Sequence, residues 1–490
     1  MPVLCEGLPQ IACDGLPSSD VSPGLRWVVN PPTVLADPVL VGESDADEFG
    51  ASLYGSVIRD GGVYRMWYQA WSKDWPNDPN LEDVATVACA ESDDGLVWQR
   101  PNYGVMEAFG TKANHLTDLP FHSSCVYLDP QAPSSARFRA FGYADPGRFR
   151  GRYTHRINRA GYFTARSADG LHWHIDSPEP VWAGSDVITC AYDRKIGGPL
   201  VMLKRGRLSG GLKRRAFLAA EWIDGKATEP VSALVPDEYD DLQARMRGFN
   251  SADYYGVGLM PTAGPTIGFL WNFRHQLPLD ACGAAGRVDL SLVYQLERGG
   301  RWFHVTGRPD WLAAESAPPW ARGGLYTAAN SIDVGDETRL YFTGTIDGHG
   351  YCGQGVDYAQ WVRSSKAFRG FAKIGLARWP RNRLIGCRSY LSNILTLVPD
   401  AGRIAGLTLN AVTQPGGSLR VAIVYRNGQP LPGYGFDNGE PIAGDHQAAP
   451  VRWKANRPWP AVPENRSFWI KIEITNSILF AFDFKNQSVG

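Results

Sequence analysis

The sequence of 490 residues has no stretch of eighteen consecutive apolar residues, so we expect no transmembrane helix. Its N-terminus also lacks a basic segment followed by an apolar one, so we expect no signal peptide and a cytoplasmic protein. Neither sign of charge dominates, because 49 lysines and arginines balance 50 aspartates and glutamates. This balance gives no reason to expect a nucleic-acid or anionic-membrane partner.

Paired cysteine motifs are absent as well. The eight cysteines are scattered along the chain: Cys5, Cys13, Cys89, Cys125, Cys190, Cys282, Cys352 and Cys387. None forms a C-x-x-C pair or a set with the spacing of zinc ligands, so we expect neither a metal nor a cofactor. Without an export signal, free thiols in a reducing compartment are predicted in preference to disulfides.

What the sequence does contain is a repeated β pattern. Residues 55–98 predict four antiparallel strands, at 57–59, 64–70, 84–92 and 97–99. Glycines lie in the predicted turns, because glycine reaches the positive φ that tight turns need. Four antiparallel strands in one sheet form one blade of a β-propeller.

The same pattern returns further along the chain. The segment GYFTARSADGLHWHIDSP, which begins at Gly161, matches VACAESDDGLVWQRP, so that Ser167 aligns with Ser92 and Trp173 with Trp98. Weaker copies cover 215–234, 288–307 and 356–375. Five units at a period of about 70 residues predict a closed ring of five blades. The alternative is a stack of unrelated hairpins in a β-sandwich.

We therefore predict an all-β protein in three parts. Residues 1–45 form an N-terminal extension that packs on the propeller. Residues 46–377 form a five-bladed β-propeller, which holds the candidate site, and residues 378–490 form a C-terminal β-sandwich. One short helix is predicted at 236–247, where acidic residues come early and basic residues late, as the helix dipole favours.

The candidate chemistry comes from the start of each innermost strand, because these positions meet at one mouth of a propeller's central channel. They hold Glu48, His122, Asp186 and Asp253, with Asp47 next to Glu48. Three carboxylates in one funnel suit glycoside hydrolysis. That reaction needs a protonated acid at the leaving oxygen and an ionised base or nucleophile on the opposite face of the sugar.

Closely spaced carboxylates cannot all ionise at low cost, so one of the three should stay protonated at neutral pH. We predict that Asp253 or Asp186 is the acid and that Glu48 is the base or nucleophile. The alternative is that each residue only caps the end of a strand. The predicted substrate-binding residues are Asp47, Tyr54, His122, Glu315 and His349. Among these, Glu315 is a reserve acid and His349 can reach the mouth from a blade tip.

Other charged segments have simpler interpretations. The runs 148–159 and 209–215 are rich in arginine and lysine. They form either solvated loops or a basic lip that meets an anionic substrate. Asp60, Asp94 and Asp169 are predicted to be structural, because aspartate is favoured in tight turns for backbone reasons.

Taken together, these segments resemble the five-bladed propeller glycoside hydrolases, the broad group that contains families 32 and 43. The nearest resemblance is to an uncharacterised bacterial branch that carries YRMYY followed by CYAESKDGIHWxKPxLGLxEFxGxKxNN. The matching segments are 64–68 (YRMWY), 88–98 (ACAESDDGLVW), 102–105 (NYGV) and 110–114 (GTKAN). The later segments GEPIAGDHQAAPVRWK and ILFAFDF resemble the trailing sandwich of that branch.

This resemblance implies a hydrolase with two aspartates and a glutamate around the axis, in which Glu48 or Asp47 stands near the place of the first-blade base. The WMNDPNG, RDP and EC motifs of family 32 are not recognisable, which argues against a fructosidase. The predicted function is an exo-acting glycoside hydrolase or transglycosidase on furanosides or short oligosaccharides, with a small carbohydrate as its partner. The alternative is a non-catalytic carbohydrate-binding or scaffold propeller.

Overall fold

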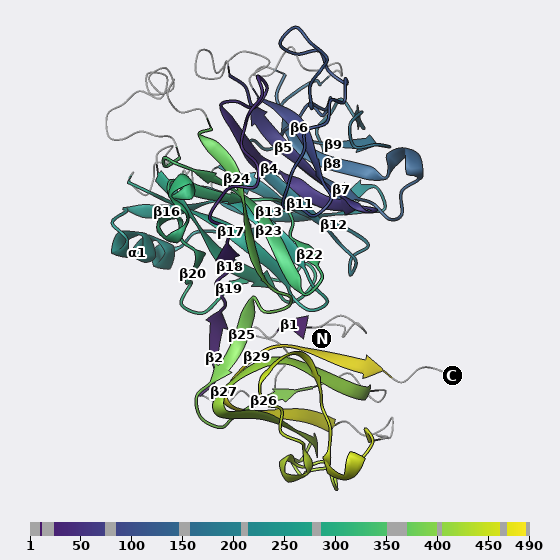
Figure 1. Cartoon of the computed structure of the whole chain (residues 1–490), viewed down its shortest axis with the longest axis vertical. Coiled ribbons are helices and arrows are strands. Elements are labelled where there is room, and N and C mark those ends of the chain that lie inside the picture. Colours follow the sequence, from purple (N-terminus) through teal and green to yellow (C-terminus); the bar gives the residue numbers. More distant parts are fainter. Residues whose placement is uncertain are drawn as a thin grey trace.

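The computed structural model of the chain describes residues 10–11, 24–73, 85–146, 157–206, 214–276, 286–349, 370–398, 404–460 and 468–486. Strands dominate these residues, which confirms the all-β prediction (Figure 1). The predicted short helix is confirmed as α1 (Glu238–Met246), and the Asp237 side chain caps it by accepting from the backbone N–H of Asp240. Within the described part of the chain, no helix is long and apolar enough to cross a membrane.

The described strands from β3 to β24 form three hydrogen-bonded sheets of four, five and thirteen strands. We describe them in chain order as five antiparallel groups. The first, fourth and fifth groups belong to the thirteen-stranded sheet, in which the single parallel pairs Val288–Gly324 and Ala372–Gly50 join them. The first group contains β4 (Gly50–Asp60), β5 (Val63–Trp71) and β6 (Ala85–Ser92). The second contains β7 (His122–Leu128), β8 (Phe138–Ala144), β9 (Gly161–Ser167) and β10 (His174–Ile175). The third contains β11 (Ile188–Asp193), β12 (Gly198–Arg205), β13 (Ala216–Ile223), β14 (Lys226–Ala227) and β15 (Val231–Leu234).

The last two groups share the same plan. The fourth contains β16 (Ser251–Pro261), β17 (Thr266–His275), β18 (Gly286–Gln295), β19 (Trp302–His304) and β20 (Asp310–Leu312). The fifth contains β21 (Gly324–Thr327), β22 (Ile332–Val334), β23 (Glu337–Thr345) and β24 (Ala372–Pro380). The N-terminal strand β3 (Thr33–Val34) pairs with β24, so it adds an outer strand to the fifth group.

The first strands of successive groups contact each other in chain order. The backbone N–H of Val126 in β7 donates to Ser56 Oγ in β4 at 2.9 Å. At the other end of the series, the N–H of Leu259 in β16 donates to Ala329 O at 2.8 Å, and the N–H of Ala329 donates to Gly55 O of β4 at 2.8 Å. The fifth group therefore returns to the first.

The repeated turn has the same geometry in both strong copies. Ser92 Oγ accepts from the N–H of Gly95, and Ser167 Oγ accepts from the N–H of Gly170, at 2.8 and 2.9 Å. Gly95 and Gly170 have φ values of 72° and 80°, a region that favours glycine. Asp94 and Asp169 each accept from two backbone N–H groups of these turns, as expected for structural turn residues.

The C-terminal strands lie in one seven-stranded sheet. Its strands are β1 (Gln10–Ile11), β2 (Arg26–Val29), β25 (Ile385–Ser389), β26 (Asn393–Leu397), β27 (Ile404–Tyr425), β28 (Asp445–Pro450) and β29 (Phe468–Asn486). The strands β27 and β29 are 22 and 19 residues long, and their register shifts between Thr413 and Ser418. They pair with each other along most of their length, and β29 also pairs with β1, β25 and β26.

The junctions between the predicted parts differ in detail from the sequence-based boundaries. Strand β2 pairs with β25 in the C-terminal sheet, while β3 pairs with β24 in the fifth group. The N-terminal extension thus contributes to both regions. Because β24 continues to Pro380 and β25 begins at Ile385, the change of sheet comes a few residues after 377. Figure 1 shows the C-terminal sheet below the five strand groups, with α1 on the flank of the fourth.

Candidate active site

The first strands of three groups each contain a β-bulge near their start, next to the candidate site. The register shifts between Ser52 and Ser56 in β4, between His122 and Cys125 in β7, and between Tyr254 and Gly256 in β16. Such bulges re-aim side chains, because an extra residue interrupts the alternation of faces. Tyr54 lies within the first irregularity and Tyr255 within the third, and both rings belong to the cluster described below.

Asp186 lies at the centre of the site, just before β11. It adopts a left-handed conformation with φ of 71°, which is uncommon outside glycine and is found at functional sites. Its carboxylate forms an ion pair with Lys204 Nζ from β12. His122 Nε2 lies 3.3 Å from Oδ1, and the Tyr255 hydroxyl donates to Oδ2 at 3.5 Å. Three strand groups therefore converge on one carboxylate.

The ionisation of Asp186 follows from these contacts. Burial acts to raise the pKa of Asp186, but the charge of Lys204 and the contact with His122 outweigh burial and hold this pKa well below its usual value. The carboxylate is thus ionised at neutral pH. This favours Asp186 as a base or nucleophile and argues against the prediction that Asp186 is a proton donor.

Aromatic rings surround this carboxylate. The ring of Tyr54 lies 5.4 Å from that of His122 and 6.0 Å from that of Trp271. The ring of Tyr255 lies 6.0 Å from that of Tyr326. Burial raises the pKa of both Tyr54 and Tyr255, so both phenols keep their protons at neutral pH. The rings come from the first, second, fourth and fifth strand groups, as expected for a central site.

Two cations and a second histidine complete the cluster. Lys204 Nζ lies 4.8 Å from the centre of the Tyr255 ring, and the guanidinium of Arg215 lies 5.2 Å from it. His349, which follows β23, has its Nε2 at 2.9 Å from the Tyr255 hydroxyl. The structure thus brings together four residues predicted from the sequence, namely Tyr54, His122, Asp186 and His349.

The sequence predicts that Asp253 faces the open mouth of the central channel, but the structure shows different surroundings for this residue. Its side chain is fully buried, with Arg214 Nε at 2.9 Å, Arg215 Nη1 at 3.6 Å and His275 Nε2 at 3.4 Å. Arg214 also pairs with Asp241 of α1 at 3.1 Å. A carboxylate held among basic groups away from solvent serves first to anchor them, so the expected open three-carboxylate funnel is not the observed arrangement.

Glu48 occupies a different place in the repeat from His122, and its role as base or nucleophile stays a prediction. The contact between Ser56 and Val126 sets a separation of 70 residues between β4 and β7, whereas Glu48 and His122 are 74 apart. Glu48 therefore lies about four residues ahead of the position equivalent to His122, and its side chain is half-buried.

The carboxylate of Asp47 is structural. It is fully buried and accepts from the Tyr68 hydroxyl at 2.8 Å and from Arg100 Nε at 2.9 Å. Burial acts to raise the pKa of Asp47, but the contact with His115 and the charge of Arg100 bring it below its usual value. These partners fix the chain just before β4 and leave no open carboxylate for a substrate.

The remaining predictions fall at the edge of the site or outside it. Glu315 lies in a short 3₁₀ helix, is exposed and pairs with Arg287 at 3.3 Å. Most of the basic run 148–159 and residues 209–213 of the second run lie outside the described residues. Arg215, the last residue of that second run, is the part that reaches the cluster.

Sequence reasoning missed Tyr255 and Lys204. Tyr255 is re-aimed by a bulge that no residue pattern announces. Lys204 had a usable signal, because it follows the apolar part of strand β12, and its side chain is only 8% exposed. Asp347 is half-buried two residues before His349, and burial raises its pKa.

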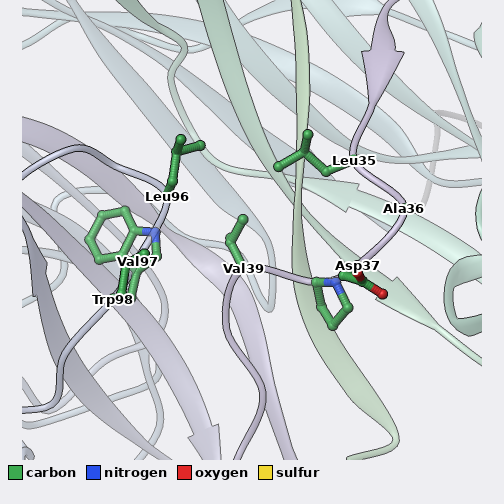
Figure 2. A pocket seen from close by; sticks show the side chains of 8 residues that line it. Leu35, Ala36, Asp37, Val39, Leu96, Val97 and Trp98 are labelled. Carbon is green, nitrogen blue, oxygen red and sulfur yellow. The ribbon is translucent and has the colours of Figure 1, made fainter.

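Two pockets lie away from this cluster. One of about 430 Å³ is lined by Leu35, Ala36, Asp37, Pro38, Val39, Leu96, Val97 and Trp98, and Figure 2 shows the mainly apolar character of these side chains. Another of about 380 Å³ lies at the far ends of the first strands, where Tyr127, Tyr192 and Asn330 line it. No predicted site residue lines either pocket.

No metal-binding group of three or more His, Cys, Asp or Glu side chains is found in the described ranges. Four cysteines fall in these ranges, and all are buried: Cys89, Cys125, Cys190 and Cys387. The other four cysteines lie outside the described residues.

Comparisons with known proteins give distant likenesses. No family model matches the chain. The uncharacterized protein Rv1502 of Mycobacterium tuberculosis is 27% identical over 198 residues, which are 38% of this chain and 53% of that protein. The chain thus matches about half the length of this curated relative.

The similar solved structures include glycoside hydrolases. One described as a glycoside hydrolase has a TM-score of 0.45 at 10% identity and covers 71% of this chain and 92% of its own. An exo-beta-1,3-galactanase from Phanerochaete chrysosporium has a TM-score of 0.39 at 11% identity, and the match covers 91% of this chain and 100% of the galactanase. An alpha-L-arabinofuranosidase from Podospora anserina has a TM-score of 0.41 at 11% identity, with 72% and 98% covered. Identities and TM-scores this low carry no argument about the reaction.

Proposed function

We propose that the protein is a glycoside hydrolase or transglycosidase that acts from the chain end on furanosides or short oligosaccharides. The observation that carries this proposal is the convergence of different strand groups on the ionised Asp186 carboxylate. An ionised carboxylate among aromatic rings and hydrogen-bonding side chains can activate water, or attack the anomeric carbon, while the rings hold the sugar.

The chain's own residues divide this work. Lys204 and His122 keep Asp186 ionised and oriented, because both contact its oxygens. The ring of Tyr54 packs 5.4 Å from that of His122 and 6.0 Å from the buried ring of Trp271, so aromatic surface lies next to the histidine that contacts Asp186. The architecture we propose around this site is a five-bladed propeller, for which the order of first-strand contacts and the return of the fifth group to the first are the support.

A second candidate function is a non-catalytic carbohydrate-binding propeller. The sealed position of Asp253 and the ion pair between Asp186 and Lys204 favour it, because both leave fewer open carboxylates than hydrolysis uses. We also propose a cytoplasmic location, and a C-terminal sandwich-like domain without catalytic residues. These two proposals do not affect the site.

The experiment that separates the two functions is a screen of aryl furanosides and pyranosides, with release of the aryl alcohol as readout. The same sugars are tested for binding by calorimetry. Release of the alcohol from at least one glycoside supports the hydrolase. Saturable binding of a sugar with no release from any matching aryl glycoside supports the binding protein and contradicts the hydrolase.

A further inference from the structure

Hydrolysis of a glycoside with a poor leaving group needs a proton donor as well as a base. Two of the predicted carboxylates are poor donors. Asp186 is ion-paired with Lys204, and Asp253 is buried against Arg214 and Arg215. Asp347, whose pKa is raised by burial, is a competing donor and is tested below. The side chains that contact Asp186 supply the other candidates.

The Tyr255 hydroxyl occupies the required place. It lies between Asp186 Oδ2, at 3.5 Å, and His349 Nε2, at 2.9 Å. The bulge in β16 aims this side chain at the cluster, while the neighbouring Tyr254 turns its hydroxyl toward Asp240 and His304. The hydroxyls of these two adjacent tyrosines thus contact two different groups of side chains.

We propose that the Tyr255–His349 pair is the proton donor to the leaving group. This inference rests on the proposed function. As the bond from C1 to the glycosidic oxygen breaks, its electron pair stays on that oxygen, which takes the hydroxyl proton of Tyr255. His349, which starts as an imidazolium in this proposal, gives its Nε2 proton to the Tyr255 oxygen and becomes neutral. Water adds to C1 and its released proton passes to Asp186. Asp186 then gives up this proton, which returns to His349 through solvent, so that all three side chains recover their starting states.

The phenol of Tyr255 is protonated at neutral pH, as a donor must be, because burial and the charge of Asp186 raise its pKa. The charge of Arg215 acts to lower this pKa, and its guanidinium lies 5.2 Å from the centre of the Tyr255 ring. Arg215 is therefore the group that favours release of the proton. His349 is held in turn by packing of its ring 5.2 Å from that of Phe273.

The test compares leaving groups, because a 2,4-dinitrophenyl group departs without protonation whereas an unsubstituted phenyl group does not. Wild type, Tyr255→Phe and His349→Gln are assayed on both aryl forms of a sugar that the wild type hydrolyses. Both variants should lose ~10²–10⁴-fold in kcat/KM on the phenyl glycoside. They should keep most of their activity on the dinitrophenyl glycoside.

Two further variants make the result decisive. Tyr254→Phe removes the neighbouring hydroxyl and should leave the ratio between the two substrates unchanged. Asp347→Asn tests the nearby half-buried carboxyl, and a selective loss in this variant with none in Tyr255→Phe would overturn the inference. Equal losses on both substrates in Tyr255→Phe and His349→Gln would also overturn it. If the wild type hydrolyses neither form of any sugar, the proposed function fails, and this inference fails with it.

Discussion

The indole Nε1 of Trp67 donates to the backbone carbonyl of Gly170 at 2.7 Å, and this contact joins the first strand group to the second. The same arrangement occurs between the fifth group and the first, where the Tyr341 hydroxyl donates to Gly95 O at 2.7 Å. The Ser-x-Asp-Gly turn is thus the part of each strong repeat that docks on the preceding group. This role explains why those residues recur in the sequence.

Replacing Gly170 with alanine should destabilise the protein. A Cβ at this position would lie 2.6 Å from Trp67 Cζ2, and φ is 80°. We expect a loss of ~2–4 kcal/mol in the free energy of unfolding, from backbone strain and overpacking together. Urea denaturation measures it.

Gly61→Ala is the matched control for Gly170→Ala. Gly61 has φ of 64°, but a Cβ added there would have no other heavy atom within 4 Å, so only backbone strain of ~1–2 kcal/mol is expected. Equal losses in the two variants would mean that contact with Trp67 contributes nothing.

Replacing Lys204 with methionine should change the pH dependence of activity. The charge of Lys204 is the strongest influence that lowers the pKa of Asp186, so its removal raises that pKa. A base with a higher pKa is protonated at a higher pH, so the acid limb of the kcat/KM profile should move to higher pH. Lys226→Met removes an exposed lysine and is the control. An acid limb that stays in place, or moves to lower pH, would contradict the assignment of Asp186 as the ionised base.

His304 should make stability depend on pH. Burial lowers the pKa of His304 to about 4, and the charge of Arg308 acts in the same direction. Because the folded-state pKa lies below the unfolded value of about 6.5, the contribution of neutral His304 is fully present above pH 6.5. It is lost progressively as the pH falls toward 4.

Urea denaturation at pH 7 and pH 5 tests this dependence. Wild type should lose up to ~2 kcal/mol more than His304→Gln between the two pH values. His172→Gln, at an exposed histidine, should behave as wild type. An identical pH dependence in wild type and His304→Gln would rule out this account of acid sensitivity.

The fold was more predictable than the site, for physical reasons. The strands around Trp67 and the Ser167 turn follow from alternation and from glycine at positive φ, which are local properties of the sequence. The position of Asp186 was also predictable, because it directly precedes a first strand. Strand register is harder to predict than strand position, because a shift of one residue turns each side chain to the other face of the sheet.

That sensitivity accounts for the difference between the predicted and observed surroundings of Asp253, and for the offset of Glu48 in the repeat. The spacing between repeats varies by several residues, so alignment of the repeats could not fix which residue of each first strand faces the centre. The bulges that aim Tyr54 and Tyr255 at the cluster depend on contacts between strands and leave no pattern in the sequence. Asp253 in addition attracts Arg214 and Arg215, which lie 39 and 38 residues earlier in the chain.

The most direct test of the central claim, that Asp186 carries the hydrolytic reaction, is the turnover of Asp186→Asn on a glycoside that the wild type hydrolyses. Glu315→Gln, at an exposed carboxylate, is the matched control. We predict that Asp186→Asn loses ~10²–10⁴-fold in kcat with an unchanged circular dichroism spectrum, while Glu315→Gln keeps wild-type turnover. Wild-type turnover in Asp186→Asn would contradict the account.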